Sequence, residues 1–221
     1  TAGGALITAR RGLTGAGTQN AGLAFGGYSV PAIRSCTEEY DGTSWTAGGA
    51  LITARRELGG AGTQTVGLAF GGRTPAAVSC TEEYNGTSWT AGGALITAKY
   101  ALAGAGEQNA ALAFGGYSEY TGSISCTEEY NGSSWASGGA LITARDYLAG
   151  AGTQTAGLAF GGGYATGACT EEYNSSTSLT KTFDYSSTTG NLSATGSFTG
   201  SFVGDGSGLT GIISDPFPYT G

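Results

Sequence analysis

The feature that most constrains this chain is a unit of about 45 residues that occurs four times in tandem. Gly-Gly-Ala-Leu-Ile-Thr-Ala, followed by Arg or Lys, begins at Gly3, Gly48, Gly92 and Gly138. Leu-Ala-Phe-Gly-Gly returns with the same period, as 23–27, 68–72, 112–116 and 158–162. A repeat of this length cannot bury an apolar face alone, so neighbouring copies must stack. Residues 1–180 are therefore expected to form one repeat domain.

Each unit contains the decamer Cys-Thr-Glu-Glu-Tyr-Asp/Asn-Gly-Thr/Ser-Ser-Trp, first at 36–45 and in a degenerate form from Cys169. Asp-Gly and Asn-Gly favour a two-residue type I′ hairpin turn, which predicts strand, turn and strand. We expect four strands in the first unit, at 13–18, 21–26, 36–40 and 43–47. The 43 glycines and the recurring Thr and Tyr indicate an all-β fold. Gly-Ala-Gly in the first strand is typical of a position where strands crowd together.

The unit resembles the kelch repeat. The resemblance rests on the glycine doublet that closes the second strand, on Tyr40 and Trp45 around the turn, and on the Arg that leads into the next unit. Here the Tyr and Trp are closer together and the unit is shorter than is usual for kelch repeats. The resemblance implies a small, four-bladed, kelch-like β-propeller. Because terminal repeats are often atypical, we expect 3–7 to pair with the last blade and close the ring.

The repeat stops near residue 180, and 181–221 is a Gly/Ser/Thr-rich segment with widely spaced apolar residues. Residues 196–212 resemble segments of bacteriophage tail-fibre and structural proteins, particularly those of phages of aquatic cyanobacteria. Such a strip has too little apolar area to fold alone. We expect a β-structured stalk, attachment or oligomerisation segment that forms an intertwined homotrimer.

Composition removes several classes of function. The net charge is −7 and no Lys/Arg cluster is present, which disfavours nucleic-acid binding. No apolar run approaches the roughly 20 residues of a membrane-spanning helix. Without His, and without a phosphate-loop or nucleophile motif, we expect a non-enzymatic protein with no cofactor and no metal site. The two glutamates of each Thr-Glu-Glu motif point to opposite faces of a strand, so they cannot act together as acid and base.

Other repeated residues are interpreted as structural. The tryptophans are expected to pack between blades. The glutamates are expected to form ion pairs with Arg10, Arg55, Lys99 and Arg145 between blades, with a calcium site as the alternative. The cysteines are interpreted as small buried hydrophobic residues, with a four-cysteine metal site or disulfides between neighbouring repeats as alternatives. These predicted structural residues are Trp45, Trp89, Trp135, Cys36, Cys80, Cys126 and Cys169.

The segment between the glycine doublet and the cysteine differs in every copy, with lengths of eight, seven, nine and six residues. Variable loops at one position of a propeller lie on one face, which is often the binding face; an idle loop under relaxed constraint gives the same pattern. We select as candidate contact residues Tyr28, Arg34, Arg73, Tyr117, Tyr120 and Tyr164.

The functional hypothesis is a phage virion protein, a tail-fibre or decoration component. Its propeller would bind a host surface glycan or protein, or neighbouring virion proteins. The first alternative is a secreted bacterial adhesin or extracellular matrix filament protein. The second is a glycan-active propeller enzyme.

Overall fold

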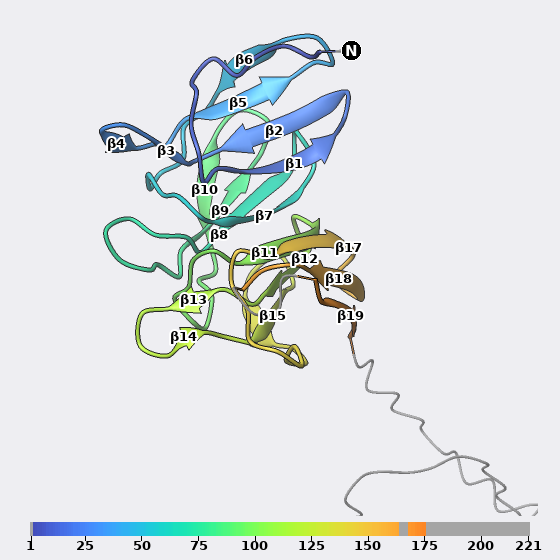
Figure 1. Ribbon diagram of the computed structural model, residues 1–221. Helices are drawn as coiled ribbons and strands as arrows, with labels where there is room; N and C mark the ends of the chain where they lie inside the picture. Colours follow the sequence, from blue (N-terminus) through green and yellow to red (C-terminus); the bar gives the residue numbers. More distant parts are fainter. Residues whose placement is uncertain (1, 164–167, 176–221) are drawn as a thin grey trace, which may run out of the picture. The chain divides into compact units, whose positions relative to one another are not determined.

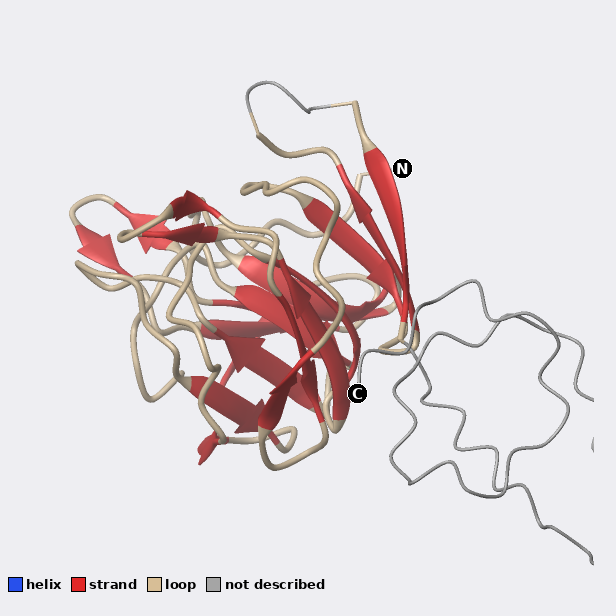
Figure 2. Cartoon of the chain, turned by 90° about the horizontal axis from the view of Figure 1, so that it is seen from below, coloured by secondary structure: helices blue, strands red, loops and turns tan. Residues whose placement is uncertain are grey.

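The structure is a computed structural model that describes residues 2–163 and 168–175, all within a compact unit of the chain, Thr1–Leu179. Every regular element in this part of the chain is a β-strand, as Figure 2 shows. No helix in it is long and apolar enough to cross a membrane. The predictions for residues 181–221, including the stalk and the trimer, lie outside the described residues.

Fifteen of the described strands form four antiparallel sheets, one from each repeat, that we call blades 1 to 4 (Figure 1). Blade 1 contains β1 (Thr14–Thr18), β2 (Ala21–Phe25), β5 (Thr37–Tyr40) and β6 (Trp45–Gly48). Blade 2 contains β7 (Gly59–Gly62), β8 (Gly67–Phe70), β9 (Thr81–Tyr84) and β10 (Trp89–Gly92). Blade 3 contains β11 (Ala103–Glu107), β12 (Ala110–Phe114), β15 (Thr127–Tyr130) and β16 (Trp135–Ser137). Blade 4 contains β17 (Ala149–Gly152), β18 (Ala156–Phe160) and β19 (Thr170–Asn174).

The blades are arranged as a four-bladed β-propeller, which confirms the predicted fold class. The first strands of successive repeats, β1, β7, β11 and β17, pack side by side in chain order. Each sheet then runs outward to its later strands in meander order. The four strand ranges expected in the first unit agree with β1, β2, β5 and β6 to within two residues at each end.

Small residues let the first strands approach one another, as the sequence predicted. A Cβ atom added to Gly60 would lie 2.9 Å from Phe25 Cζ of the preceding blade. At Gly104 it would lie 2.6 Å from Phe70 Cζ and would also meet the backbone oxygen of Gly60. Larger side chains are therefore excluded where the sheets meet.

The turn inside the decamer differs from the predicted type I′ hairpin. Tyr40 pairs with Trp45, so the connection has four residues, and of these only Gly42 has a positive φ, 91°. The Asp41 carboxylate accepts the N–H groups of Thr43 and Ser44, each at 2.8 Å. The bond from Ser44 and, after it, the bond from Thr43 lower the pKa of Asp41. An Asx turn thus closes a longer loop than the Asp-Gly pair implied.

The repeated ion pairs lie within blades, so the expectation of pairs between blades is wrong. Arg55 Nη2 lies 3.2 Å from Glu82 Oε1 of its own repeat, and Lys99 Nζ lies 3.1 Å from Glu128 Oε1. The same Glu82 carboxylate accepts the Ile52 N–H at 2.6 Å. Each pair therefore fastens the incoming linker to the third strand of the same blade. The other two pairs are Arg10–Glu38 and Arg145–Glu171.

The N-terminal segment lies on blade 1, so the prediction that it pairs with the last blade is also wrong. Ile7 N–H donates to Glu38 Oε2 at 2.7 Å, and Trp45 Nε1 donates to the Gly4 carbonyl at 3.2 Å. Among the described strands, β19 pairs only with β18. The segment follows blade 1 because it is the linker of the first repeat and carries the Arg10 that pairs with Glu38.

The predicted structural residues have separate locations. Trp89 and Trp135 are buried between blades, whereas Trp45 is half-buried. All four cysteines are free; Cys36, Cys80 and Cys126 are half-buried and Cys169 is exposed, so they are less buried than expected. Cys126 Sγ accepts a hydrogen bond from Lys99 Nζ at 3.3 Å, and Arg55 contacts Cys80 in the same way. The thiols of Cys80 and Cys126 thus line polar ion-pair sites and not an apolar core.

Candidate functional site

The variable segments of the first three repeats lie on one side of the blades, on the left in Figure 1. Two of them form small hairpin ribbons, β3 (Tyr28–Ser29) with β4 (Ala32–Ile33), and β13 (Tyr117–Ser118) with β14 (Gly122–Ser123). The corresponding segment of repeat 4 includes residues 164–167, so candidate Tyr164 lies outside the described residues. The prediction that these segments share a face therefore holds for the first three repeats.

A second variable position of the repeat adjoins these segments. It is the residue that follows the buried Arg or Lys of each linker: Arg11, Arg56, Tyr100 and Asp146. In the first three repeats this residue pairs through its backbone with the residue after the glycine doublet. Arg11 N–H donates to Tyr28 O at 3.0 Å, and Tyr28 N–H donates back at 2.8 Å. This pairing places two variable side chains from each repeat next to one another.

Arginine and tyrosine side chains interleave along this row, which we call the Tyr/Arg surface. The guanidinium carbon of Arg11 lies 5.4 Å from the centre of the Tyr28 ring, and that of Arg56 lies 5.1 Å from it. Arg56 belongs to the next blade, so one ring contacts cations from two repeats. Cation–π contacts at these distances hold both partners in place. The Tyr/Arg surface consists of Arg11, Tyr28, Arg56, Arg73, Tyr100 and Tyr117.

The same pattern continues into blade 3. Arg73 lies 4.5 Å from the centre of the Tyr100 ring, which in turn packs at 5.2 Å on Tyr117. Glu57 forms an ion pair with Arg73: its Oε2 lies 2.7 Å from Nε, and its Oε1 accepts a hydrogen bond from Nη2 at 3.1 Å. Partial burial opposes the charge, but the hydrogen bond and charge of Glu57 raise the pKa of Arg73. Arg73 is therefore a fixed cation.

Every accessible positive charge of the described residues lies on this face. The eight Lys and Arg side chains of this part divide into two groups of four. Four are buried in the ion pairs with Glu inside the blades. The other four are Arg11, Arg34, Arg56 and Arg73. A chain with a net charge of −7 thus presents its accessible guanidinium groups together.

Two other candidates lie at the ribbons and outside the row. Arg34 donates from Nε and Nη2 to Ser29 Oγ at 3.0 and 2.8 Å, which fixes it across the β3–β4 ribbon. Tyr120 is 95% exposed in the loop between β13 and β14. The structure therefore brings Tyr28, Arg73 and Tyr117 into one row and leaves Arg34 and Tyr120 beside it.

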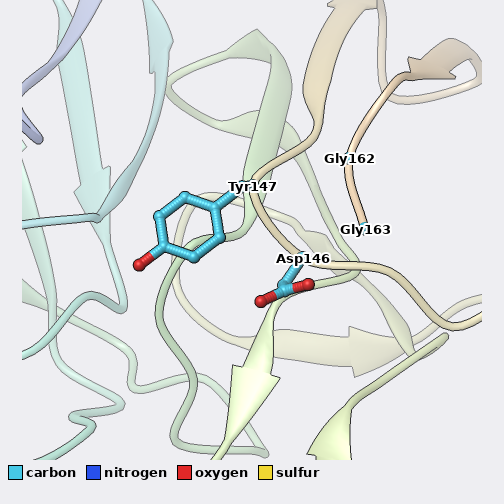
Figure 3. A pocket seen from close by; sticks show the side chains of 4 residues that line it. All are labelled: Asp146, Tyr147, Gly162 and Gly163. Carbon is cyan, nitrogen blue, oxygen red and sulfur yellow. The ribbon is translucent and has the colours of Figure 1, made fainter. Parts of the chain in front are cut away.

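Blade 4 contributes a recess in place of a side chain. The residue equivalent to Tyr28, Arg73 and Tyr117 is Gly163, and a cavity of about 420 Å³ lies there (Figure 3). Asp146 and Tyr147 line it from the linker, and Asp146 Oδ1 accepts the Ser123 hydroxyl at 3.2 Å. Partial burial and the charge of Glu57 raise the pKa of Tyr147. The recess thus lies where the first three repeats carry a Tyr or Arg side chain.

The linker residues of this site were missed by the sequence interpretation. The segment just before them is the most regular part of the repeat, and they follow it directly: Arg11, Arg56, Glu57, Tyr100 and Tyr147. The available signal was their diversity. Arg-Gly, Arg-Glu, Tyr-Ala and Asp-Tyr occupy the same two positions between an invariant basic residue and an invariant Leu.

Comparison with models of known protein families and with curated proteins finds no match for this chain. Its function is therefore argued from the site itself.

The described side chains of the site are of the types that recognise ligands. Within residues 2–163 and 168–175, no three His, Cys, Asp or Glu side chains are grouped as metal ligands. In the first repeat Glu38 is bound to Arg10, and Glu39 accepts the Tyr84 hydroxyl, so neither member of that pair faces the Tyr/Arg surface. Arginine and tyrosine, with tryptophan, are enriched among the energetically dominant contacts of interfaces.

Proposed function

We propose that the chain is a non-enzymatic recognition module of a phage virion, a tail-fibre or decoration component that binds an acidic host surface glycan. The observation that carries the proposal is the Tyr/Arg surface, where three of the four accessible guanidinium groups of the described residues, those of Arg11, Arg56 and Arg73, interleave with tyrosine rings. A fixed cation beside a flat ring matches a sugar that carries a carboxylate.

The chemistry of the two side chains supports this choice of ligand. A guanidinium group binds a carboxylate through two parallel hydrogen bonds, which a neutral sugar cannot accept with the same strength. A tyrosine ring offers an apolar face and a polar hydroxyl group, which suits the mixed surface of a pyranose. Because neighbouring contacts already hold Arg56 and Arg73, little side-chain freedom is lost on binding.

The placement in a virion is supported by the sequence resemblances. The repeat resembles kelch repeats, and residues 196–212 resemble phage fibre segments. Under this proposal, 181–221 attach the module or make it trimeric, and host recognition belongs to the blades. Mass spectrometry of purified particles checks the placement, and particles that lack the chain would contradict it.

Binding of a soluble polyuronate tests the recognition function. We expect titration calorimetry to detect binding of alginate and not of dextran, which has a similar backbone size but no charge. Binding should weaken with added salt because exposed charges are screened. Arg56→Gln should lower the affinity at least about tenfold, as expected for a central interface arginine.

A matched control lies at the other end of blade 3. Glu107 is an exposed charged residue at the end of β11, next to the turn that leads to β12 and away from the strand ends that carry the variable loops. Glu107→Gln should leave alginate binding unchanged, and circular dichroism should be the same for both variants. Equal binding of dextran, or full affinity in Arg56→Gln, would refute the proposed ligand.

A further inference from the structure

The interface between neighbouring blades is built three times from the same contacts. Blades 1 to 3 each insert the Phe that ends their second strand against the next blade, and at the first two interfaces this ring packs on the Trp of that blade. Phe25 and Trp89 have ring centres 4.9 Å apart, and Phe70 and Trp135 repeat this distance. The three inserted side chains, Phe25, Phe70 and Phe114, are fully buried. We call the side that carries this Phe the outgoing face and the side that receives it the incoming face.

Two polar contacts accompany each inserted ring. Gln64 Nε2 of blade 2 donates to the carbonyls of Gly22 and Tyr40 of blade 1, at 3.3 and 2.6 Å. Tyr84 donates its hydroxyl proton to Glu39 of blade 1 at 2.5 Å. The equivalent donors Gln108, Gln154, Tyr130 and Tyr173 make the same bonds at the next two interfaces. The incoming face thus supplies donors and the outgoing face supplies acceptors.

The outgoing face of blade 4 has the same groups but no described blade beyond it. Phe160 is 39% exposed, in contrast to the complete burial of its three equivalents. Thr170 and Glu172 are exposed, whereas the equivalent Thr37, Thr81 and Thr127 are each at most 2% exposed. An exposed phenylalanine beside an exposed acceptor is the unoccupied half of the repeated interface.

The incoming face of blade 1 is the other unoccupied half. Gln19 is exposed, and Tyr40 and Trp45 are half-buried, although their equivalents in blades 2 and 3 are buried. A groove of about 520 Å³ lies on this face, lined in part by Leu13, Gly15 and Trp45. Gly15 is the equivalent of Gly60, which receives Phe25 at the first internal interface.

Blade 1 also has the conformation of a docked blade. A Cβ added to Gly3 would meet the Tyr40 hydroxyl oxygen at 2.8 Å, and one added to Gly48 would meet that of Tyr84 at 2.7 Å. The linker therefore crosses blade 1 as it crosses blade 2. Strands β1 and β17 make no packing contact as extensive as those between β1 and β7 or β11 and β17. Among the residues that the structure describes, no blade covers either face, so both faces are uncovered at the same time in one chain.

We propose that a second copy of this chain docks its blade 4 onto blade 1, head to tail. Phe160 of one copy enters the groove at Gly15 and Trp45 of the other. Gln19 donates to the Gly157 and Tyr173 carbonyls, and Tyr40 donates to Glu172, as the internal interfaces dictate. The occupant is a copy of the same repeat because the two exposed faces are complementary halves of an interface that the chain already builds three times. Such a contact is heterologous and extends a series of blades beyond one chain.

Two variants of the full-length chain each remove one half of the contact. Phe160→Glu puts a charge on the outgoing face, and Gln19→Glu turns a donor into an acceptor against two carbonyl oxygens. Both residues are exposed in the described structure, so the blades should still fold. We expect sedimentation to show self-association of the wild type and at least tenfold weaker association in each variant. Tyr120→Glu, at another exposed aromatic residue, should associate as the wild type does.

Mixing the two variants gives the sharpest result. The Gln19→Glu chain keeps Phe160, and the Phe160→Glu chain keeps Gln19, so one intact contact can form between them. An equimolar mixture should give a heterodimer that does not grow further, while each variant alone stays dissociated. A wild-type chain that is monomeric at about 1 mM would overturn the proposal. Association that persists in both variants would also overturn it, since self-association would then lie elsewhere, as in 181–221.

Discussion

Tyr84, Tyr130 and Tyr173 place their hydroxyl groups against glutamates of the preceding blade. Burial and, after it, the hydrogen bond to Glu39 raise the pKa of Tyr84 to about 12, and the other two tyrosines are shifted to about 12 by the same causes. An unfolded chain releases these protons near pH 10. The native state therefore binds more protons than the unfolded state between pH 10 and 12, and stability falls as the pH rises through this range.

Tyr84→Phe should remove about one third of that pH-dependent loss, because it removes one of three equivalent groups. The variant should also be about 1 kcal/mol less stable at pH 7, since Glu39 loses a hydrogen-bond donor. Urea unfolding measured from pH 8 to 12 checks both effects. Tyr120→Phe serves as the control, because Tyr120 is 95% exposed and should leave the profile unchanged. An identical pH profile for Tyr84→Phe would contradict the assignment.

The buried ion pairs offer an internal comparison at the residue scale. Lys99 occupies in blade 3 the place that Arg55 has in blade 2, and each binds the glutamate of its own blade. Arg55→Lys should therefore cost at most about 1 kcal/mol. Arg55→Met should cost about 3–5 kcal/mol, because it leaves Glu82 buried without its cation. Equal unfolding midpoints for the two variants in urea would mean that the pair has no role in stability.

At the scale of the element, the first strand of each blade depends on glycine. Gly104→Ala should cost about 1–3 kcal/mol, since its Cβ meets Phe70 and the backbone of β7. Gly139→Ala is the matched control: its Cβ would lie 3.7 Å from the nearest atom and its φ is not positive. The control should change stability by less than about 0.5 kcal/mol. Thermal unfolding separates the two, and a Gly104→Ala variant as stable as the control would refute close packing of these strands.

The elements predicted well from the sequence are those in which local pattern and repetition agree. The alternation of side chains along each strand and the turn residues predicted the four strands of the first unit. The recurrence of Gly-Ala-Gly predicted that the first strands are closely packed. The blade to which each buried cation binds was predicted wrongly. The spacing of Arg, Lys and Glu shows that the ion pair recurs in every repeat, but it does not show whether the cation reaches the glutamate of its own blade or of a neighbouring blade. The turn at Asp41 was missed because its carboxylate, and not its backbone conformation, closes the loop. Three of the six residues of the Tyr/Arg surface, Arg11, Arg56 and Tyr100, were missed. They lie in the linkers, at a position that varies between repeats but directly follows the invariant linker motif.

At the scale of the whole molecule, stability should vary along the series of blades, because each blade contacts only its neighbours. Blades 2 and 3 are packed on both sides, and β8 and β12 are almost wholly buried. Each end blade has one uncovered face, and the described residues of β1 and β17 are half-buried or exposed. Local opening should therefore start at the two end blades.

Hydrogen exchange followed by mass spectrometry tests this gradient. In dilute protein, amides of β8 and β12 should exchange more slowly than those of β2 and β18, although all four are second strands of equivalent sequence. Raising the concentration should protect β2 and β18 selectively if a second copy covers the end faces, and Phe160→Glu should abolish that added protection. Because each strand is compared with its own equivalent in another blade, differences in intrinsic exchange largely cancel. Equal protection of all four strands in dilute protein would show that the end blades are already covered within one chain.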